Sequence, residues 1–138
     1  MYENRRCAMH RVSLIREGSV PYPDPLLTAM RSAAGAAQVA ATLLRDADRE
    51  HFGVLSLDRR HHVVAVNPAM IGGVSQCTGA PPEVFLPASR SRAAGRLCAH
   101  NHPSGSVEPS ESERGLTARL VQAGRLLSIP VVDHIIIG

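Results

Sequence analysis

The residues best suited to chemistry lie close together, between positions 100 and 113. His100 and His102 are separated by one residue, and Glu113 follows a turn that is rich in proline and glycine. Hydrolytic zinc sites use three protein ligands of these types and keep a fourth position for water. The two imidazoles and the carboxylate therefore predict a metal site in this stretch.

The two histidines form the simplest part of this pattern. In an extended chain, residues two apart project to the same side, so His100 and His102 can reach one ion together. A single histidine at the end of a strand would instead be interpreted as a hydrogen-bonded core residue. The pairing is what favours a metal ligand.

Glu113 supports two interpretations. Ser110 and Glu113 match the capping box, in which a serine and a glutamate three residues later satisfy the first backbone groups of a helix. Glu113 also lies on the apolar stripe of that helix, with Leu116 and Leu120. A carboxylate on that stripe needs a partner to offset its desolvation. Two histidines and a cation would provide one.

A metal-activated water also needs a base, for which Glu50 is a candidate. Glu50 begins a predicted strand and lies on the same side of it as Phe52 and Val54. From the sequence alone, an ordinary carboxylate at a strand start is the better interpretation of Glu50.

Other histidines and the cysteines fit structural positions better. Strand or turn positions are expected for His51, His61, His62 and His134. Only His134, which follows Asp133, is also a candidate for supporting a metal ligand from outside. Cys98 is expected to be a small core residue. The three cysteines lack C-x-x-C spacing, which indicates reduced thiols.

The elements that position these residues follow from turn signals and apolar periodicity. Strands are expected over residues 50–57, 62–66, 95–100 and 129–138, with weaker candidates at 12–16 and 71–76. Helices are expected over residues 24–44, 81–94 and 110–127. This alternation indicates an α/β domain. The loop 100–110 joins a strand end to a helix start, which is the usual place for a ligand in such sheets.

Two local patterns set the bounds of these elements. The first helix is expected to begin at Asp24-Pro25, with an apolar stripe made of Leu27, Met30, Ala34, Ala37, Ala41 and Leu44. Asn67-Pro68 is expected to end the strand that begins near His62.

The composition fits one ordinary domain. A length of 138 residues with 44% hydrophobic residues can bury a single core, and we expect a flexible tail over residues 1–10 before one domain over 11–138. All 15 basic residues are arginines, and they are scattered along the chain with few aromatic residues, so nucleic-acid binding is only weakly supported. The chain lacks a signal-peptide pattern and a convincing membrane span, which indicates a cytoplasmic protein.

A family resemblance strengthens the metal-site hypothesis. The segment His100-Asn-His-Pro-Ser-Gly, followed by Pro-Ser110-x-x-Glu113 and preceded by Glu50, resembles the JAMM (MPN/JAB) metalloprotease motif. That motif is a glutamate on an early strand followed by H-x-H-x7-S-x-x-D. The segments at 81–85, 123–127 and 133–137 are most similar to the RadC branch, and the likeness covers about residues 49–138.

The resemblance implies a fold and a mechanism. The fold would be a mixed β-sheet flanked by helices, similar to that of cytidine deaminases. His100, His102 and Glu113 would bind Zn²⁺, Glu50 would be the general base, and Ser110 would donate a hydrogen bond to the oxyanion. The substrate would be a peptide or protein cut at a peptide or isopeptide bond, in some members at a ubiquitin-like tail. The RadC branch is also associated with DNA repair.

The chain departs from this pattern in three places. Glu113 stands where the family has aspartate, and its side chain is longer by about 1.5 Å. The segment before Arg49 does not resemble the helix-hairpin-helix region that RadC proteins carry, and the family's domain continues beyond Gly138. Two alternatives therefore stay open, a scaffold without activity that binds a partner protein and a DNA-associated protein.

Overall fold

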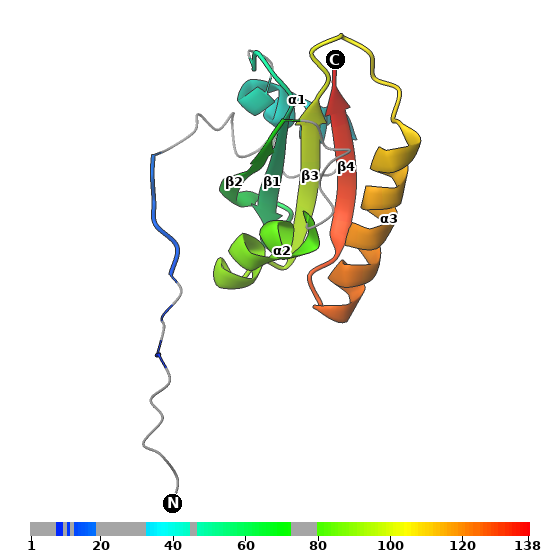
Figure 1. Cartoon of the computed structure of the whole chain (residues 1–138). Coiled ribbons are helices and arrows are strands. Elements are labelled where there is room, and N and C mark those ends of the chain that lie inside the picture. The colour runs from blue at the N-terminus through cyan, green and yellow to red at the C-terminus, as the bar shows by residue number, and fades with distance from the viewer. Residues whose placement is uncertain (1–7, 10, 12, 19–32, 45–46, 73–79) are drawn as a thin grey trace, which may run out of the picture.

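The computed structural model describes residues 8–9, 11, 13–18, 33–44, 47–72 and 80–138. Within them it contains three helices and one four-stranded sheet (Figure 1). In chain order the elements are α1 (Ala33–Leu44), β1 (His51–Leu57), β2 (Val63–Ile71), α2 (Ala80–Arg90), β3 (Gly95–Asn101), α3 (Glu111–Leu126) and β4 (Val131–Ile137).

The sheet is mixed, as the resemblance implied. Its strand order is β2-β1-β3-β4, with β1 antiparallel to both of its neighbours and β3 parallel to β4. A parallel pair needs a long crossover connection, which α3 supplies here. The expected α/β class and the mixed sheet flanked by helices are confirmed.

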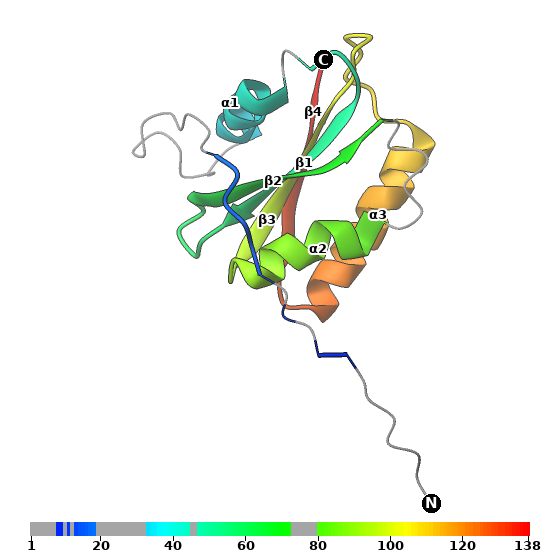
Figure 2. The same ribbon diagram turned by 60° about the vertical axis from the view of Figure 1, so that its left-hand side comes forward.

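The helices cover both faces of the sheet (Figure 2). α1 packs its buried face on Leu55, Leu57, Leu97 and Ala99. On the other face, residues of α2 and α3 pack on Phe52, Val54 and Cys98. Because successive strand residues point to opposite faces, each central strand contributes to both layers. β1 and β3 therefore lie in the middle of the molecule.

α3 is the best-defined helix in terms of local signals. Ser110 caps its start, and Glu111 and Glu113 lie in its first turn, where negative charge is favoured. Near its end, Gly124 lets the chain pass close by, because a Cβ at that position would lie 2.8 Å from the carbonyl oxygen of Ile129. The return of the chain into β4 therefore depends on a residue without a side chain.

One arginine lies in the core between the helices and the sheet. Arg96 is fully buried, and its guanidinium lies 3.3 Å from the centre of the Phe85 ring. It donates hydrogen bonds to the carbonyl oxygens of Val84 and Ile129, at 3.4 and 3.0 Å. Burial lowers the pKa of Arg96 to about 10, so the side chain stays charged at neutral pH. Arg96 thus links α2 to the loop before β4.

β2 differs from the expectation. It does not end at Asn67-Pro68 but continues to Ile71, so the separate short strand expected over 71–76 is wrong for Ile71, and residues 73–76 lie outside the described part. β2 is an edge strand, where a proline without an N–H group is tolerated. The pairing with β1 shifts register between Phe52 and Gly53, next to this proline.

Two other elements also differ from their expected bounds. The candidate strand over 12–16 is absent from the described residues 11 and 13–16. α2 ends at Arg90 and not near Ala94, because the chain turns at Ser91 and Arg92, and Arg92 has a positive φ of 55°.

The buried face of α1 is rotated from the predicted stripe. Ala41 and Leu44 are buried as expected, but Ala34 is exposed, and Ala36, Val39 and Ala40 are buried in its place. Alanine at many positions made the stripe ambiguous, since small residues fit either side of a helix. The predicted start at Asp24 lies outside the described residues, as does most of the tail expected over 1–10. Among the described helices, none has the length and apolar character required to cross a membrane.

Candidate metal centre

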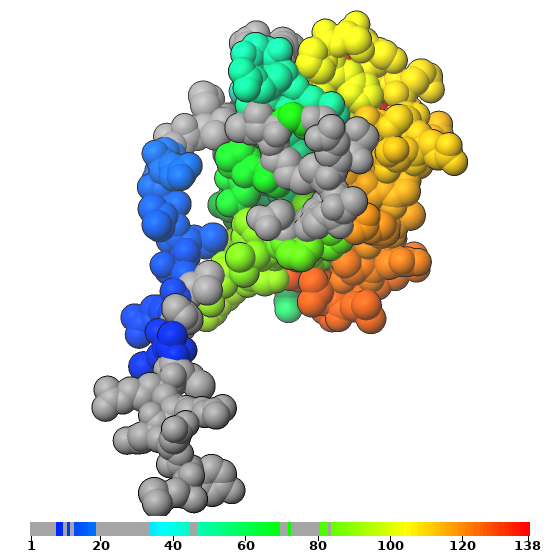
Figure 3. Space-filling view, in the orientation of Figure 1, coloured from blue at the N-terminus to red at the C-terminus, as the bar shows by residue number. Residues whose placement is uncertain are grey.

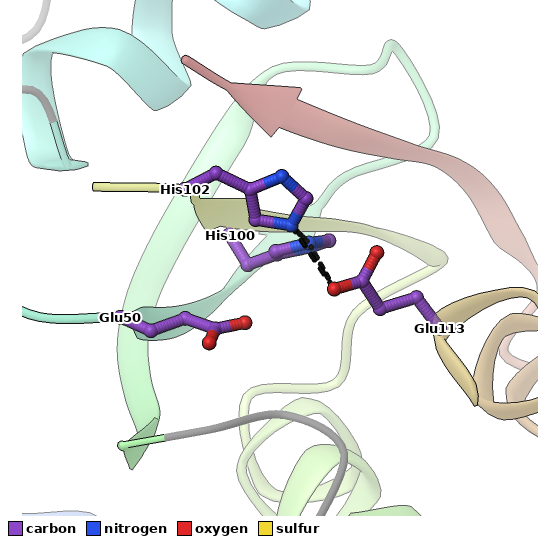
Figure 4. A group of neighbouring side chains, drawn as sticks. All are labelled: Glu50, His100, His102 and Glu113. Carbon is purple, nitrogen blue, oxygen red and sulfur yellow. Dashed lines mark hydrogen bonds and ion pairs between the residues drawn. The ribbon is translucent and has the colours of Figure 1, made fainter. Parts of the chain in front are cut away.

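Four side chains that could bind a metal ion meet at one end of the central strands (Figure 4). They are Glu50, His100, His102 and Glu113, and one possible ligand atom of each lies within 4.8 Å of the others. The antiparallel pairing of β1 with β3 places Phe52 opposite His100, so the start of β1 lies beside the end of β3. The loop that follows brings the first turn of α3 to the same end of the sheet.

Three of these residues form a tight group. His100 Nε2 lies 2.9 Å from His102 Nε2, and Glu113 Oε1 lies 3.0 Å from His102 Nε2 and 3.6 Å from His100 Nε2. His100 is fully buried and Glu113 is 7% exposed. Ligand atoms of a tetrahedral zinc site are separated by roughly 3.3 Å when each lies 2.0–2.1 Å from the metal. The three observed separations bracket that value, so the group fits a zinc-sized ion.

The capping box predicted for Glu113 is present, and the same carboxylate also faces the histidines. Glu113 Oε2 accepts a hydrogen bond from the Ser110 backbone N–H at 2.8 Å, and Ser110 Oγ accepts one from the Glu113 N–H at 3.2 Å, which completes the capping box. Glu113 Oε1 is left to face the histidines. The longer side chain therefore still reaches the group, because the cap holds one oxygen and directs the other.

The hydrogen bonds of His102 orient its ring. Its Nδ1 lies 2.9 Å from the carbonyl oxygen of Ser106, and a carbonyl can only accept, so Nδ1 carries the proton. In the neutral ring, Nε2 then presents a lone pair to Glu113 Oε1, 3.0 Å away. Two acceptors this close repel each other unless a cation or a proton lies between them. The arrangement suits a metal cation.

The electrostatics keep the ligand atoms available. Burial lowers the pKa of His100, although the nearby Glu113 carboxylate opposes this effect, so the ring is neutral at neutral pH. Burial alone would raise the pKa of Glu113, but the hydrogen bond from the Ser110 backbone and the two histidines lower it overall. Metal ligands must be deprotonated in this way.

A third histidine supports the site from behind. His134 Nε2 lies 2.8 Å from His100 Nδ1, and His134 Nδ1 lies 2.6 Å from Thr117 Oγ1. The sequence favoured an ordinary strand position for His134 and gave no role to Thr117. A usable signal was the spacing of Thr117, which follows Glu113 by four residues and so lies on the same helix face.

Asn101 lies between the two histidines and holds the chain around Glu50. Its Oδ1 accepts a hydrogen bond from the His51 N–H at 2.7 Å, and its Nδ2 donates to the Arg49 carbonyl at 3.0 Å. The two bonds bracket Glu50, which precedes β1 and is half-buried. Sequence reasoning missed Asn101, because an amide at the centre of H-x-H has no ligand role.

The other predicted residues take ordinary positions. Ser110 is exposed at the helix start, where its hydroxyl proton is not used by the cap. His62 bonds to Asp58 in the turn between β1 and β2. Cys98 is buried, which raises its pKa to about 12, as expected for a core thiol.

A cavity of about 430 Å³ adjoins the group. Its lining includes His100, Glu113 and His134, with apolar walls from Val121 and Ile136. The loop between β3 and α3, drawn in yellow, lies at the surface (Figure 3), beyond the end of β3 (Figure 1). Side chains that could bind a metal therefore lie next to a space open to a ligand.

Fold and site together define a class of protein. It is an α/β domain with a mixed sheet in which two histidines and two glutamates converge where β3 meets α3. The family described as the RadC-like JAB domain matches residues 30–138, and the chain belongs to this family.

Similar proteins agree with this assignment. The chain is 45% identical over 91 residues to a UPF0758 protein of Rubrobacter xylanophilus. The matched segment covers 66% of this chain and 40% of that protein. It is 41% identical over 101 residues to a UPF0758 protein of Syntrophomonas wolfei. This second match covers 73% of this chain and 43% of that protein. The matched part of the chain thus spans less than half the length of these relatives.

Proposed function

We propose that the domain binds one Zn²⁺ ion through His100, His102 and Glu113 and hydrolyses a peptide or isopeptide bond. The observation that carries the proposal is the convergence of these three side chains, with the Glu50 carboxylate beside them. Two imidazoles and one carboxylate with an open fourth position are the ligand set of hydrolytic zinc sites. Membership of the RadC-like JAB family supports the same chemistry.

The residues around the ion would have separate catalytic and positioning roles. Bound zinc lowers the pKa of a water molecule and polarises a scissile carbonyl. Glu50 would take a proton from the attacking water and pass it to the leaving amine, because its carboxylate lies within 4.8 Å of the ligand atoms. Asn101 would keep Glu50 in place through the chain on either side of it.

Ser110 would stabilise the oxyanion. Its oxygen accepts the capping hydrogen bond from Glu113, which leaves the hydroxyl proton free to be donated. A fixed donor at the position of the developing negative charge lowers the barrier for acyl transfer. The substrate would be an extended peptide or a protein tail, such as a ubiquitin-like one.

Metal content is the first test of the proposal. Protein purified without added zinc is expected to hold about one metal ion per chain, and His100→Ala is expected to hold none, because removing one of three ligands lowers affinity sharply. Mass spectrometry under conditions that keep metals bound measures the metal content of both proteins. If the chain holds no metal even at micromolar zinc, the scaffold alternative replaces the enzyme.

Catalysis needs a separate test. Glu50→Gln is expected to slow hydrolysis of a peptide library and of isopeptide-linked tails by about 10²–10⁴-fold, to a small residual rate, while the protein keeps its zinc. The glutamine has the same length but cannot accept the proton. If Glu50→Gln cleaves as fast as the unaltered protein, Glu50 is not the base. DNA binding that falls steeply with salt would instead favour the DNA-associated alternative.

A further inference from the structure

We propose that Thr117 and His134 set the tautomer of His100 and thereby keep its Nε2 atom free of a proton for the metal. Both would be positioning residues, since their contacts lie on the side of His100 that faces away from His102. This inference rests on the proposed metal site, and it adds a reason why one of the ligands is ready to bind.

The fold places the three residues in a row. His134 lies in β4 beside β3, where its Cα pairs with that of Cys98, two residues before His100. Thr117 lies in α3 one turn after Glu113. The Phe52 ring stacks on His100 and meets His134 edge-on, at centroid distances of 6.2 and 5.4 Å. The two imidazoles are therefore held in fixed orientations.

When a metal is bound, the proton of each of these three side chains is fixed on one atom. His100 Nε2 must be a bare lone pair, so the ring proton is on Nδ1 and is donated to His134 Nε2 at 2.8 Å. The proton of His134 is then on Nδ1 and is donated to Thr117 Oγ1 at 2.6 Å. Thr117 has a single proton, which it donates to the Glu113 carbonyl at 2.8 Å. Every donor has an acceptor.

The reverse arrangement would block the metal. If Thr117 donated to His134 Nδ1, His134 would donate from Nε2 to His100, and His100 would carry its proton on Nε2. The Thr117 hydroxyl is therefore needed as an acceptor only in the first arrangement, in which His134 carries its proton on Nδ1 and His100 Nε2 is free for the metal. Without it, that arrangement leaves a half-buried N–H group of His134 without an acceptor, which disfavours it.

The test compares Thr117→Val with Thr117→Ser. Valine has the same shape but no hydroxyl, and we expect it to weaken zinc binding by about 10–100-fold, as is usual for partners of metal ligands. Serine keeps the hydroxyl, so its affinity is expected to stay within roughly threefold of the unaltered protein. Competition with a chelator of known affinity measures all three. Equal affinities in valine and serine variants would overturn the inference.

A double variant separates this role from a general loss of structure. In His134→Gln, the amide oxygen can accept from His100 without an acceptor at Thr117. Thr117→Val is therefore expected to cost little affinity in the His134→Gln background. An equal cost in both backgrounds would overturn the inference, because Thr117 would then act only through packing.

The ¹⁵N shifts of the imidazole rings at pH 7.5 give a readout that needs no metal. Both rings are neutral there, since burial lowers the pKa of His134 to about 4 and also lowers that of His100. Thr117→Val is expected to move the proton of His134 from Nδ1 to Nε2, and Thr117→Ser is not. If the unaltered protein does not bind zinc, the proposed function is rejected. An unchanged tautomer in Thr117→Val would reject this inference separately.

Discussion

At the scale of single residues, the Glu113 carboxylate joins a helix cap to the group of candidate metal ligands. Its Oε2 closes the capping box with Ser110, and its Oε1 faces the two histidines. The sequence predicted both roles as alternatives. It could not predict that a capping carboxylate would also face the histidines, because this depends on how the carboxylate is turned, which only the packing of α3 against the sheet determines.

The two roles of Glu113 can be separated by substitution. Glu113→Gln keeps the length of the side chain and an oxygen for the Ser110 N–H, so helix stability is expected to change little. The variant lacks the negative charge and is expected to lose the zinc. Glu113→Ala is expected to lose the zinc and also about 0.5–2 kcal/mol of stability with the cap. Metal analysis and urea unfolding measure these effects, and zinc retained by Glu113→Gln would contradict the ligand role.

Asn101 offers a second prediction at this scale. Asn101→Leu leaves the His51 N–H and the Arg49 carbonyl without their partners, and the chain around Glu50 is expected to shift. A shift of about 1 Å can lower activity by about 100-fold. Zinc content is expected to stay unchanged, since the ligands lie outside this contact.

A double variant tests whether Asn101 acts through Glu50. In the Glu50→Gln background the base is already absent, so adding Asn101→Leu is expected to cause no further loss of activity. A further loss there, or a loss of zinc in Asn101→Leu alone, would assign Asn101 to a different role.

At the scale of elements, strands and helices with strong local signals were predictable. The capping box located the start of α3 at Ser110, and apolar runs located β1 and β3 to within one residue. β2 was cut short because a proline normally ends a strand, and its tolerance at Pro68 depends on β2 lying at the edge of the sheet. The order of strands is a tertiary property that local sequence does not carry.

The supporting residues of the site were unpredictable for the same reason. Thr117 and His134 lie 17 residues apart in the chain and meet only because β4 runs parallel to β3 under α3. The ligand candidates were found because H-x-H is a local pattern, whereas their partners come from other elements.

The packing of α3 on the sheet leads to a matched pair of predictions. Leu120 is fully buried against the sheet, and Leu126 on the same helix is 87% exposed. Leu120→Ala is expected to lower the free energy of unfolding by about 2–5 kcal/mol, because a buried side chain leaves a cavity. Leu126→Ala is expected to change it by less than about 0.5 kcal/mol. Urea unfolding of metal-free protein measures both. Similar losses in the two variants would contradict the assignment of Leu120 to the buried face of α3 and of Leu126 to the exposed face.

At the scale of the whole molecule, the candidate metal ligands lie where the ends of the central strands meet α3. The two central strands supply Glu50, His100 and His102 at their ends, and α3 supplies Glu113 from one face of the sheet. Buried groups that must be neutral or paired, such as His100 and Glu113, therefore lie where the sheet packs against α3. Their ionisation should affect the stability of the entire domain as well as the site.

This connection predicts how stability depends on pH in metal-free protein. Burial lowers the pKa of His134 to about 4, against 6.5 for an ordinary histidine, so the unfolded chain takes up this proton first as pH falls. Stability is therefore expected to be full above pH 6.5 and to fall toward pH 4, by on the order of 3 kcal/mol from this residue. His100, whose pKa is also lowered, acts in the same direction. Glu113, whose pKa is lowered from the usual 4.5, adds a further loss once pH falls below about 4.5.

Urea unfolding at pH 7.5, 5.5 and 4.5 in the presence of a chelator measures this dependence. His134→Gln has no proton to gain in that range, so its stability is expected to fall less steeply between pH 6.5 and 4.5 than that of the unaltered chain. Bound zinc should add stability at pH 7.5 and lose its effect as protons compete for the ligands. Equal stability of the metal-free protein at pH 7.5 and 4.5 would mean that His134 is not held neutral inside the fold.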